Sequence, residues 1–166
     1  ALKHLFPEVP VNGGTFRPIT FRIPEGSALA AVYPTAVGGY LEMVGIVIDL
    51  VFGALVKLVP DRVPAAFFGT TGVATISGRH PQTNRYFSGG WPYAGGYGGS
   101  MASDGLVHGV SPQSMAKLMS FELVEHRYPV RFDEVALREN SGGPGWHRGG
   151  CGTRIAYRAL ANALVS

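Results

Sequence analysis

The chain has 166 residues, enough for one domain with a sizeable core, and 46% of them are apolar whereas only 15% are charged. This apolar content excludes an intrinsically disordered chain, and the scattered basic residues behind a net charge of +3 exclude a nucleic-acid-binding stripe. The single cysteine, Cys151, excludes an internal disulfide framework and a cysteine-rich zinc site. Because residues 1–7 also lack a secretory signal, we expect a cytoplasmic protein.

The scarcity of charged residues leaves little polar coating for an isolated surface. In one interpretation, the chain is a compact, loop-rich β protein that stands alone. In the other, another chain or another segment covers part of its surface. The composition favours the covered surface.

In the first part of the chain, residues 1–40 are predicted to be extended, with loose alternation from Thr15 to Ile23 and a turn at 24–27. The strongest helix candidate runs from Leu41 to Val59 and is apolar on nearly every face. Its length approaches that of a membrane span, but Asp49 in its middle would be costly at the centre of a bilayer. We therefore expect a helix buried in a soluble protein and no membrane partner, with a membrane segment as the alternative.

The rest of the chain alternates between short strands, one short helix and glycine-dense loops. The predicted elements are a strand within 65–77, a polar turn at 78–84, a return strand at 85–87, a glycine-dense loop at 88–100, a helix over 112–124 with Ser111 as its N-cap, and strands over 128–137 and 153–159. The sequence thus predicts a strand-rich α+β fold with one long buried apolar helix, formed by residues 1–166 as a single segment.

The most informative segment is 140–152, in which six of thirteen residues are glycine. Such density means that the backbone reaches positive φ, or that it lies so close to another group that a Cβ would clash. Charged and aromatic side chains are spaced among the glycines, so the segment is not a flexible linker. A tight loop of this kind presents Ser141, His147 and Arg148 from a fixed frame, which serves either a ligand or only the fold.

Two acidic residues are further candidates, each with an ordinary alternative. Asp104 precedes a glycine, which is a common turn signal, or it supplies a carboxylate beside a glycine-lined pocket. Glu122 shares a helical face with Glu125, which is typical of a solvated helix end, or the two belong to a polar cluster that holds a loop or a ligand. The spacing alone favours the turn and the solvated helix end. The five histidines never occur at metal-ligand spacing, so no metal site is predicted in this chain.

Short motifs spread along the chain occur in one fixed order. They are Pro10-Val11-Asn12-x-Gly14, Arg17-Pro18-Ile19, Pro24-Glu25-Gly26-Ser27, Pro34-Thr35-Ala36-Val37-Gly38-Gly39, Asp49 with Ala54, Pro60-Asp61-Arg62-Val63-Pro64-Ala65, Gly89-Gly90, Asp104-Gly105, Glu122-x-x-Glu125-x-Arg127-Tyr128-Pro129, and Arg138-x-Asn140-Ser141-Gly142-Gly143-Pro144-Gly145-x-x-Arg148-Gly149-Gly150-x-Gly152. In this order the chain resembles the C-terminal half of the hydantoinase B/oxoprolinase family, whose relatives include the large subunits of acetone and acetophenone carboxylases. Ser111 departs from the family pattern, which usually has Asn there.

The resemblance implies part of a cytoplasmic enzyme assembly with a small-molecule substrate. The implied chemistry is ATP-driven opening of a cyclic amide, such as a hydantoin or 5-oxoproline, or ATP-driven carboxylation of a ketone. The implied partners are a hydantoinase A-type subunit that uses ATP and the upstream half of the B-type subunit. A divalent metal would then bind outside this chain, and this chain would not be active alone.

The candidate residues within this chain fall into two groups. They are Arg148, Asp104 and Glu122 for catalysis, and Gly142, Gly143 and Gly145 for binding a cofactor group. Two alternatives stay open. The chain is instead a non-catalytic docking subunit whose glycines permit close packing, or a free-standing β-rich binding domain.

Overall fold

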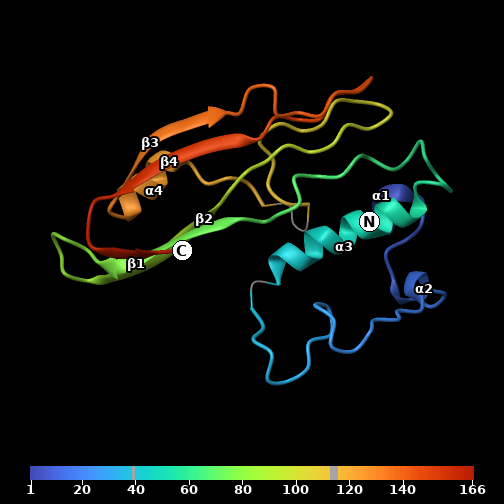
Figure 1. Ribbon diagram of the computed structural model, residues 1–166, viewed down its shortest axis with the longest axis horizontal. Helices are drawn as coiled ribbons and strands as arrows, with labels where there is room; N and C mark the ends of the chain where they lie inside the picture. The colour runs from blue at the N-terminus through green and yellow to red at the C-terminus, as the bar shows by residue number, and fades with distance from the viewer. Residues whose placement is uncertain (39, 113–115) are drawn as a thin grey trace.

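A computed structural model describes residues 1–38, 40–112 and 116–166 of the chain. Its elements are α1 (Leu2–Leu5), α2 (Gly13–Phe16), α3 (Leu41–Leu55), β1 (Val73–Arg79), β2 (Tyr86–Pro92), α4 (Phe121–Arg127), β3 (Val130–Leu137), β4 (Thr153–Ala159) and β5 (Ala163–Val165). All strands and α4 gather at one end of the molecule, and α1, α2 and α3 lie at the other (Figure 1). The predicted α+β fold is therefore confirmed.

Two small antiparallel sheets form the strand-rich end. One has the strand order β2-β1-β5, and the other is the β3–β4 hairpin, with an irregularity between Phe132 and Glu134. The strand predicted over 153–159 coincides with β4, and that over 128–137 contains β3. The return strand from Arg85 continues as β2 through Pro92, into residues that we expected to form a loop.

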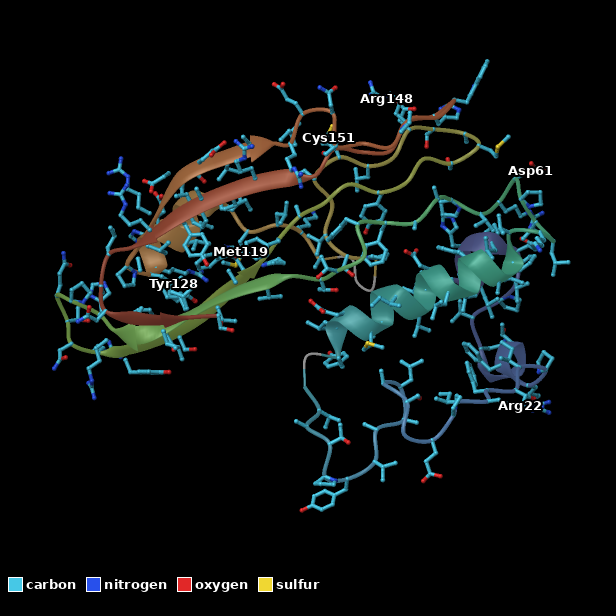
Figure 2. The ribbon with its side chains drawn as sticks, in the orientation of Figure 1. Arg22, Asp61, Met119, Tyr128, Arg148 and Cys151 are labelled. Carbon is cyan, nitrogen blue, oxygen red and sulfur yellow. The ribbon has the colours of Figure 1, made fainter. Side chains whose placement is uncertain are left out.

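The hydrophobic core lies between the two sheets and α4. Its buried residues are Ala74, Ile76, Trp91, Val124 and Val130. The Trp91 ring makes edge contacts with Phe132 at 5.4 Å and with Tyr157 at 5.2 Å, measured between ring centroids. Met119 and Tyr128 pack against this core from the segments on either side of α4 (Figure 2). Residues of both sheets bury Trp91, and this shared contact joins the two sheets into one unit.

Three glycine-rich segments extend from the sheets and lie against one another; residues 94–99, 104–109 and 142–150 are called the glycine bundle here (Figure 1). Gly95 and Gly109 exchange two backbone hydrogen bonds of 2.8 Å, and Gly150 N–H donates to the Tyr97 carbonyl at 2.8 Å. A Cβ on Gly96 would lie 1.8 Å from the Gly150 oxygen. Within the described residues, positive φ occurs at Gly26 and Gly69 but at no glycine of the bundle. Close approach, and not left-handed backbone, explains these glycines except Gly143, on which a Cβ would meet nothing within 4 Å.

Helix α3 is shorter and much less buried than the sequence predicted. It ends at Leu55 instead of Val59, and Gly45 is its only buried residue within the described chain. The prediction of a buried helix is wrong for this chain: residues 67–71 and 111 contact one face of α3 and α1 touches its far end, but Leu50 of α3 is still 61% exposed. No helix among the described residues has the length and hydropathy needed to cross a membrane.

Two further predictions of secondary structure were wrong. Instead of extended structure, residues 13–16 form α2, because the Asn12 side chain caps it by accepting from the N–H groups of Gly14 and Thr15. The helix predicted to start after Ser111 starts after Ser120, whose hydroxyl accepts from Leu123 N–H. Part of that predicted helix, residues 113–115, lies outside the described residues.

Candidate functional site

The main hollow of the molecule lies between the glycine bundle, the segment 60–70 and the far end of α3. Its volume is about 1120 Å³, and it is open to solvent. Its floor is aromatic: the rings of Phe67 and Phe68 lie 5.1 Å apart, and each lies within 6.3 Å of the Tyr97 ring. Glycine backbone of the bundle also lines the hollow, and Gly95 packs directly on the Phe68 ring. This arrangement suits a flat, partly apolar ligand that also needs backbone hydrogen bonds.

One end of the hollow is polar. It is lined by Arg138, Ser141, Gly143 and Thr153. Arg138 directly follows β3 and Thr153 opens β4, so the end of the β3–β4 hairpin places both at this edge. Behind Thr153, the hydroxyl lies 2.7 Å from Nδ1 of His108, a residue held at φ 57°.

The structure brings Asp104 and the backbone of Arg148 together, and a site that contains both residues requires this. Asp104 Oδ1 accepts from the Arg148 N–H at 2.9 Å and lies 3.3 Å from His147 Nδ1. The Arg148 side chain stands at the outer face of the bundle (Figure 2) and is not among the residues that line the hollow. Asp104 therefore fixes the loop that carries Arg148, and the guanidinium is presented outward.

Glu122 lies on α4, in the strand-rich end, and does not line the hollow. Its carboxylate accepts a short hydrogen bond from the Ser120 hydroxyl, and this bond lowers the pKa of Glu122. The structure therefore does not bring Glu122 together with Asp104 and Arg148, and its catalytic role stays a prediction.

The three candidate binding glycines differ in their surroundings. Gly142 packs on Gly149 and a Cβ on Gly145 would meet His147, whereas a Cβ on Gly143 would meet nothing within 4 Å. Among the described residues, none accepts a hydrogen bond from the N–H groups of these three glycines, while the N–H of Gly149 donates to the Gly143 carbonyl at 2.9 Å. The three N–H groups are available, but only Gly143 lines the hollow.

Asp49 is placed where α3 meets the bundle. Its carboxyl accepts a hydrogen bond from the Phe67 backbone and lies near Tyr97. Burial raises the pKa of Asp49 above the usual value, and burial followed by the Asp49 charge raises the pKa of Tyr97. Burial at this junction therefore disfavours the charged form of both groups.

Sequence reasoning missed two parts of this site. Arg138 belongs to the last sequence motif, but its position beside the hollow depends on where the β3–β4 hairpin ends. The pairing of His108 with Thr153 joins residues 45 positions apart, and no local pattern predicts it. Within the described residues, no three His, Cys, Asp or Glu side chains lie close enough together to hold a metal ion. The donor set of these residues does not fit a metal.

The chain also matches a family of known proteins. The family model of hydantoinase B/oxoprolinase matches residues 1–166, and the chain belongs to this family.

Proteins that align with nearly the whole chain have different names. The chain is 36% identical to an uncharacterised protein of Methanocaldococcus jannaschii over all of its length and 29% of that protein. It is 30% identical to the B subunit of a putative D-/L-hydantoinase of Pseudomonas sp. (95% of the chain, 26% of the relative). It is 31% identical to the beta subunit of the caprolactamase of Pseudomonas jessenii (94% and 28%). The chain thus spans between a quarter and a third of the length of these relatives.

Among solved structures, a nucleotide-free acetone carboxylase from a study of ATP-dependent acetone carboxylation is similar with a TM-score of 0.52. The similarity covers 63% of this chain and 14% of that one, at 22% identity, and so it shows the fold alone.

Proposed function

We propose that the chain is part of an ATP-dependent, multi-subunit enzyme that opens a cyclic amide or carboxylates a ketone. The observation that carries this proposal is the family match over all 166 residues, together with relatives named as a hydantoinase B subunit, a caprolactamase beta subunit and a 5-oxoprolinase. The first two names describe subunits, which supports further chains in the assembly, including one of hydantoinase A type. The chain would correspond to the C-terminal half of the B-type subunit, and the assembly would be cytoplasmic.

This chemistry requires hydrogen-bond donors that point at the carbonyl oxygen of the substrate. ATP on a partner subunit would phosphorylate the carbonyl oxygen, which makes that oxygen a good leaving group. Donors aimed at the oxygen stabilise the negative charge that develops there. The N–H of Gly143 lines the hollow, and those of Gly142 and Gly145 have no described acceptor. The outward guanidinium of Arg148, set by Asp104, would reach a phosphate presented by the partner. A divalent metal would be supplied by a segment outside this chain.

Arg148→Ala in the complete complex tests this assignment. We expect turnover of a cyclic amide with ATP to fall by about 10-fold or more, which is the usual cost of losing one charge-assisted hydrogen bond, while the complex still assembles. Unchanged turnover with unchanged assembly would remove Arg148 from the site.

The docking role is the second candidate, and the exposure of α3 favours it. Leu50 is 61% exposed, although α3 is apolar on nearly every face. In this role the chain holds subunits together while chemistry occurs elsewhere. Docking would be supported over catalysis if variants of the residues that line the hollow reduce assembly of the complex. The complexes that still assemble would then carry out the chemical step at the normal rate.

A further inference from the structure

Hydrogen bonds hold the backbone of Arg138, a residue that lines the polar end of the hollow. Its N–H donates to the Gly152 carbonyl at 2.8 Å, and its own carbonyl accepts from the Ser141 hydroxyl at 2.6 Å. That hydroxyl in turn accepts from the Gly152 N–H at 2.8 Å. The backbone at Arg138 is therefore clamped to the start of β4, and the side chain leaves from a fixed point at the edge of the hollow.

Within residues 1–38, 40–112 and 116–166, the guanidinium of Arg138 has no protein partner. Among the described residues, no carboxylate lies within ion-pair distance of it and no group accepts a hydrogen bond from it. The arginines of the neighbouring strand differ: Arg154 pairs with Glu134 at 3.6 Å, and Arg158 pairs with Asp133 at 3.1 Å. Asp104, the acid of the bundle, already accepts from the Arg148 N–H and faces His147. An unpaired positive charge thus lines the hollow at its polar end.

The groups around Arg138 are suited to an anion. The N–H of Gly143 has no described acceptor and stands beside open space. The Thr153 hydroxyl is oriented by His108 at 2.7 Å. A guanidinium, a free backbone N–H and a fixed hydroxyl together bind carboxylates and phosphoryl groups in proteins.

We propose that the polar end of the hollow binds an oxyanion of a small ligand, with Arg138 as the charged binding residue and the Gly143 N–H as a second donor. The aromatic floor of Phe67, Phe68 and Tyr97 takes the ring of the ligand. The oxyanion has two chemical sources, which are a carboxylate carried by the cyclic amide and a phosphoryl group placed on its carbonyl oxygen. The identity of the ring rests on the proposed function, but the oxyanion site does not.

The test compares Arg138→Gln with Arg131→Gln in the complete complex. Arg131 is an exposed arginine of β3, opposite Arg158 in the β3–β4 hairpin, and it does not line the hollow. The substrates are 5-oxoproline, which carries a carboxylate, and 2-pyrrolidinone, which has the same ring without it. Inorganic phosphate is the third probe, and its binding is measured by calorimetry without turnover.

The two sources predict different results for Arg138→Gln. If Arg138 binds the carboxylate, KM for 5-oxoproline rises by about 10- to 100-fold and KM for 2-pyrrolidinone is unchanged, as expected for one lost charge-assisted contact. If it binds the phosphoryl group, kcat falls for both substrates and phosphate affinity falls by a similar factor. Arg138→Lys keeps the charge and restores part of the effect in either case, whereas Arg131→Gln matches the unaltered complex.

The inference is overturned if Arg138→Gln assembles normally and changes neither the kinetics nor phosphate binding. A complex that turns over no cyclic amide would count against the proposed function instead. Phosphate binding that is lost in Arg138→Gln and kept in Arg131→Gln would still support the oxyanion site in that case.

Discussion

At the scale of single residues, contact distance and not backbone conformation explains the glycines of the bundle other than Gly143. Gly96, Gly105 and Gly150 each have a backbone oxygen of a neighbouring segment within 2.1 Å of the place where a Cβ would stand. The sequence indicates that such a segment is constrained, but it does not indicate which other segment it touches. For that reason the glycine-rich segment 140–152 was predicted to be a candidate site, whereas its packing on 94–109 emerged only from the structure.

The substitution Gly96→Ala should disrupt the bundle. The new Cβ would lie 1.8 Å from the Gly150 oxygen, and both partners are backbone, so neither can rotate away. We expect a loss of about 3 kcal/mol, the upper end of the usual cost of overpacking, because both groups are rigid. Thermal melting of the complete subunit measures it. Gly13→Ala is the matched control, because its Cβ meets nothing within 4 Å; equal melting of the two variants would contradict the packing argument.

Asp49→Asn tests the electrostatics where α3 meets the bundle. Burial raises the pKa of Asp49 in the folded state, so the favourable contribution of its protonated form is present at low pH and is lost as the pH rises through that folded pKa. Asn stays neutral and keeps an oxygen for the Phe67 N–H. At pH 7 the variant should therefore melt at a higher temperature than the unaltered protein. The gain in the free energy of unfolding should be less than about 1 kcal/mol, because solvent still reaches the carboxyl.

The pH profile separates this effect from a simple change of packing. The two melting temperatures should converge towards pH 4, near the usual pKa of an aspartic acid, about 3.9. A variant that melts lower than the unaltered protein at pH 7 would show that the charge of Asp49 stabilises the junction, contrary to the direction of its pKa shift.

At the scale of elements, the sequence predicted those that carry their own pattern. Strand β4 has alternating apolar positions and was predicted with its observed bounds, and β3 was predicted to within two residues. Strand β5 was missed, because its three residues are defined by pairing with Ile76, Ser77 and Gly78, far away in the chain. Helix α3 was predicted from its composition, but its burial depends on surfaces that the described residues do not provide. Arg138 was missed as a site residue for a related reason, since the end of a hairpin decides where it points.

Ser120→Ala should weaken α4 through its first turn. The hydroxyl accepts from Leu123 N–H at 3.4 Å and donates to Glu122, and it is the largest cause of the lowered pKa of Glu122. Loss of this N-cap should cost about 1 kcal/mol of stability and raise the pKa of Glu122 towards its usual value. Thermal melting and NMR titration of the Glu122 carboxyl measure the two effects. Ser120→Asn, which also caps helices, should restore stability, and failure of both readouts to move would refute the cap.

At the scale of the whole molecule, the described chain exposes far more surface than a compact monomer of its mass. Its solvent-accessible surface is 11678 Å². A compact monomer of 17.6 kDa would expose about 7,900 Å². The excess exceeds what one partner normally buries in a standard interface, about 800 Å². Much of it is apolar, including Trp146 at 97% exposure and Tyr33 at 94%. The relatives are between three and four times longer, and we expect further protein, from the same polypeptide or from a partner subunit, to cover the face of α3.

Covering of α3 predicts a difference between residues 1–166 alone and the complete subunit. Alone, the segment should bind a hydrophobic dye and self-associate, because Leu50 and Val44 on α3 face solvent. In the complete subunit, dye binding should be lost, and the backbone amides of α3 should exchange with solvent more slowly than in the isolated segment, by about 10-fold for each 1.4 kcal/mol of added protection. The strands β3 and β4, which pair within the segment, serve as the internal control and should change less. If residues 1–166 are monomeric and bind no dye, while α3 exchanges equally fast in both forms, then no other part of the protein covers this helix.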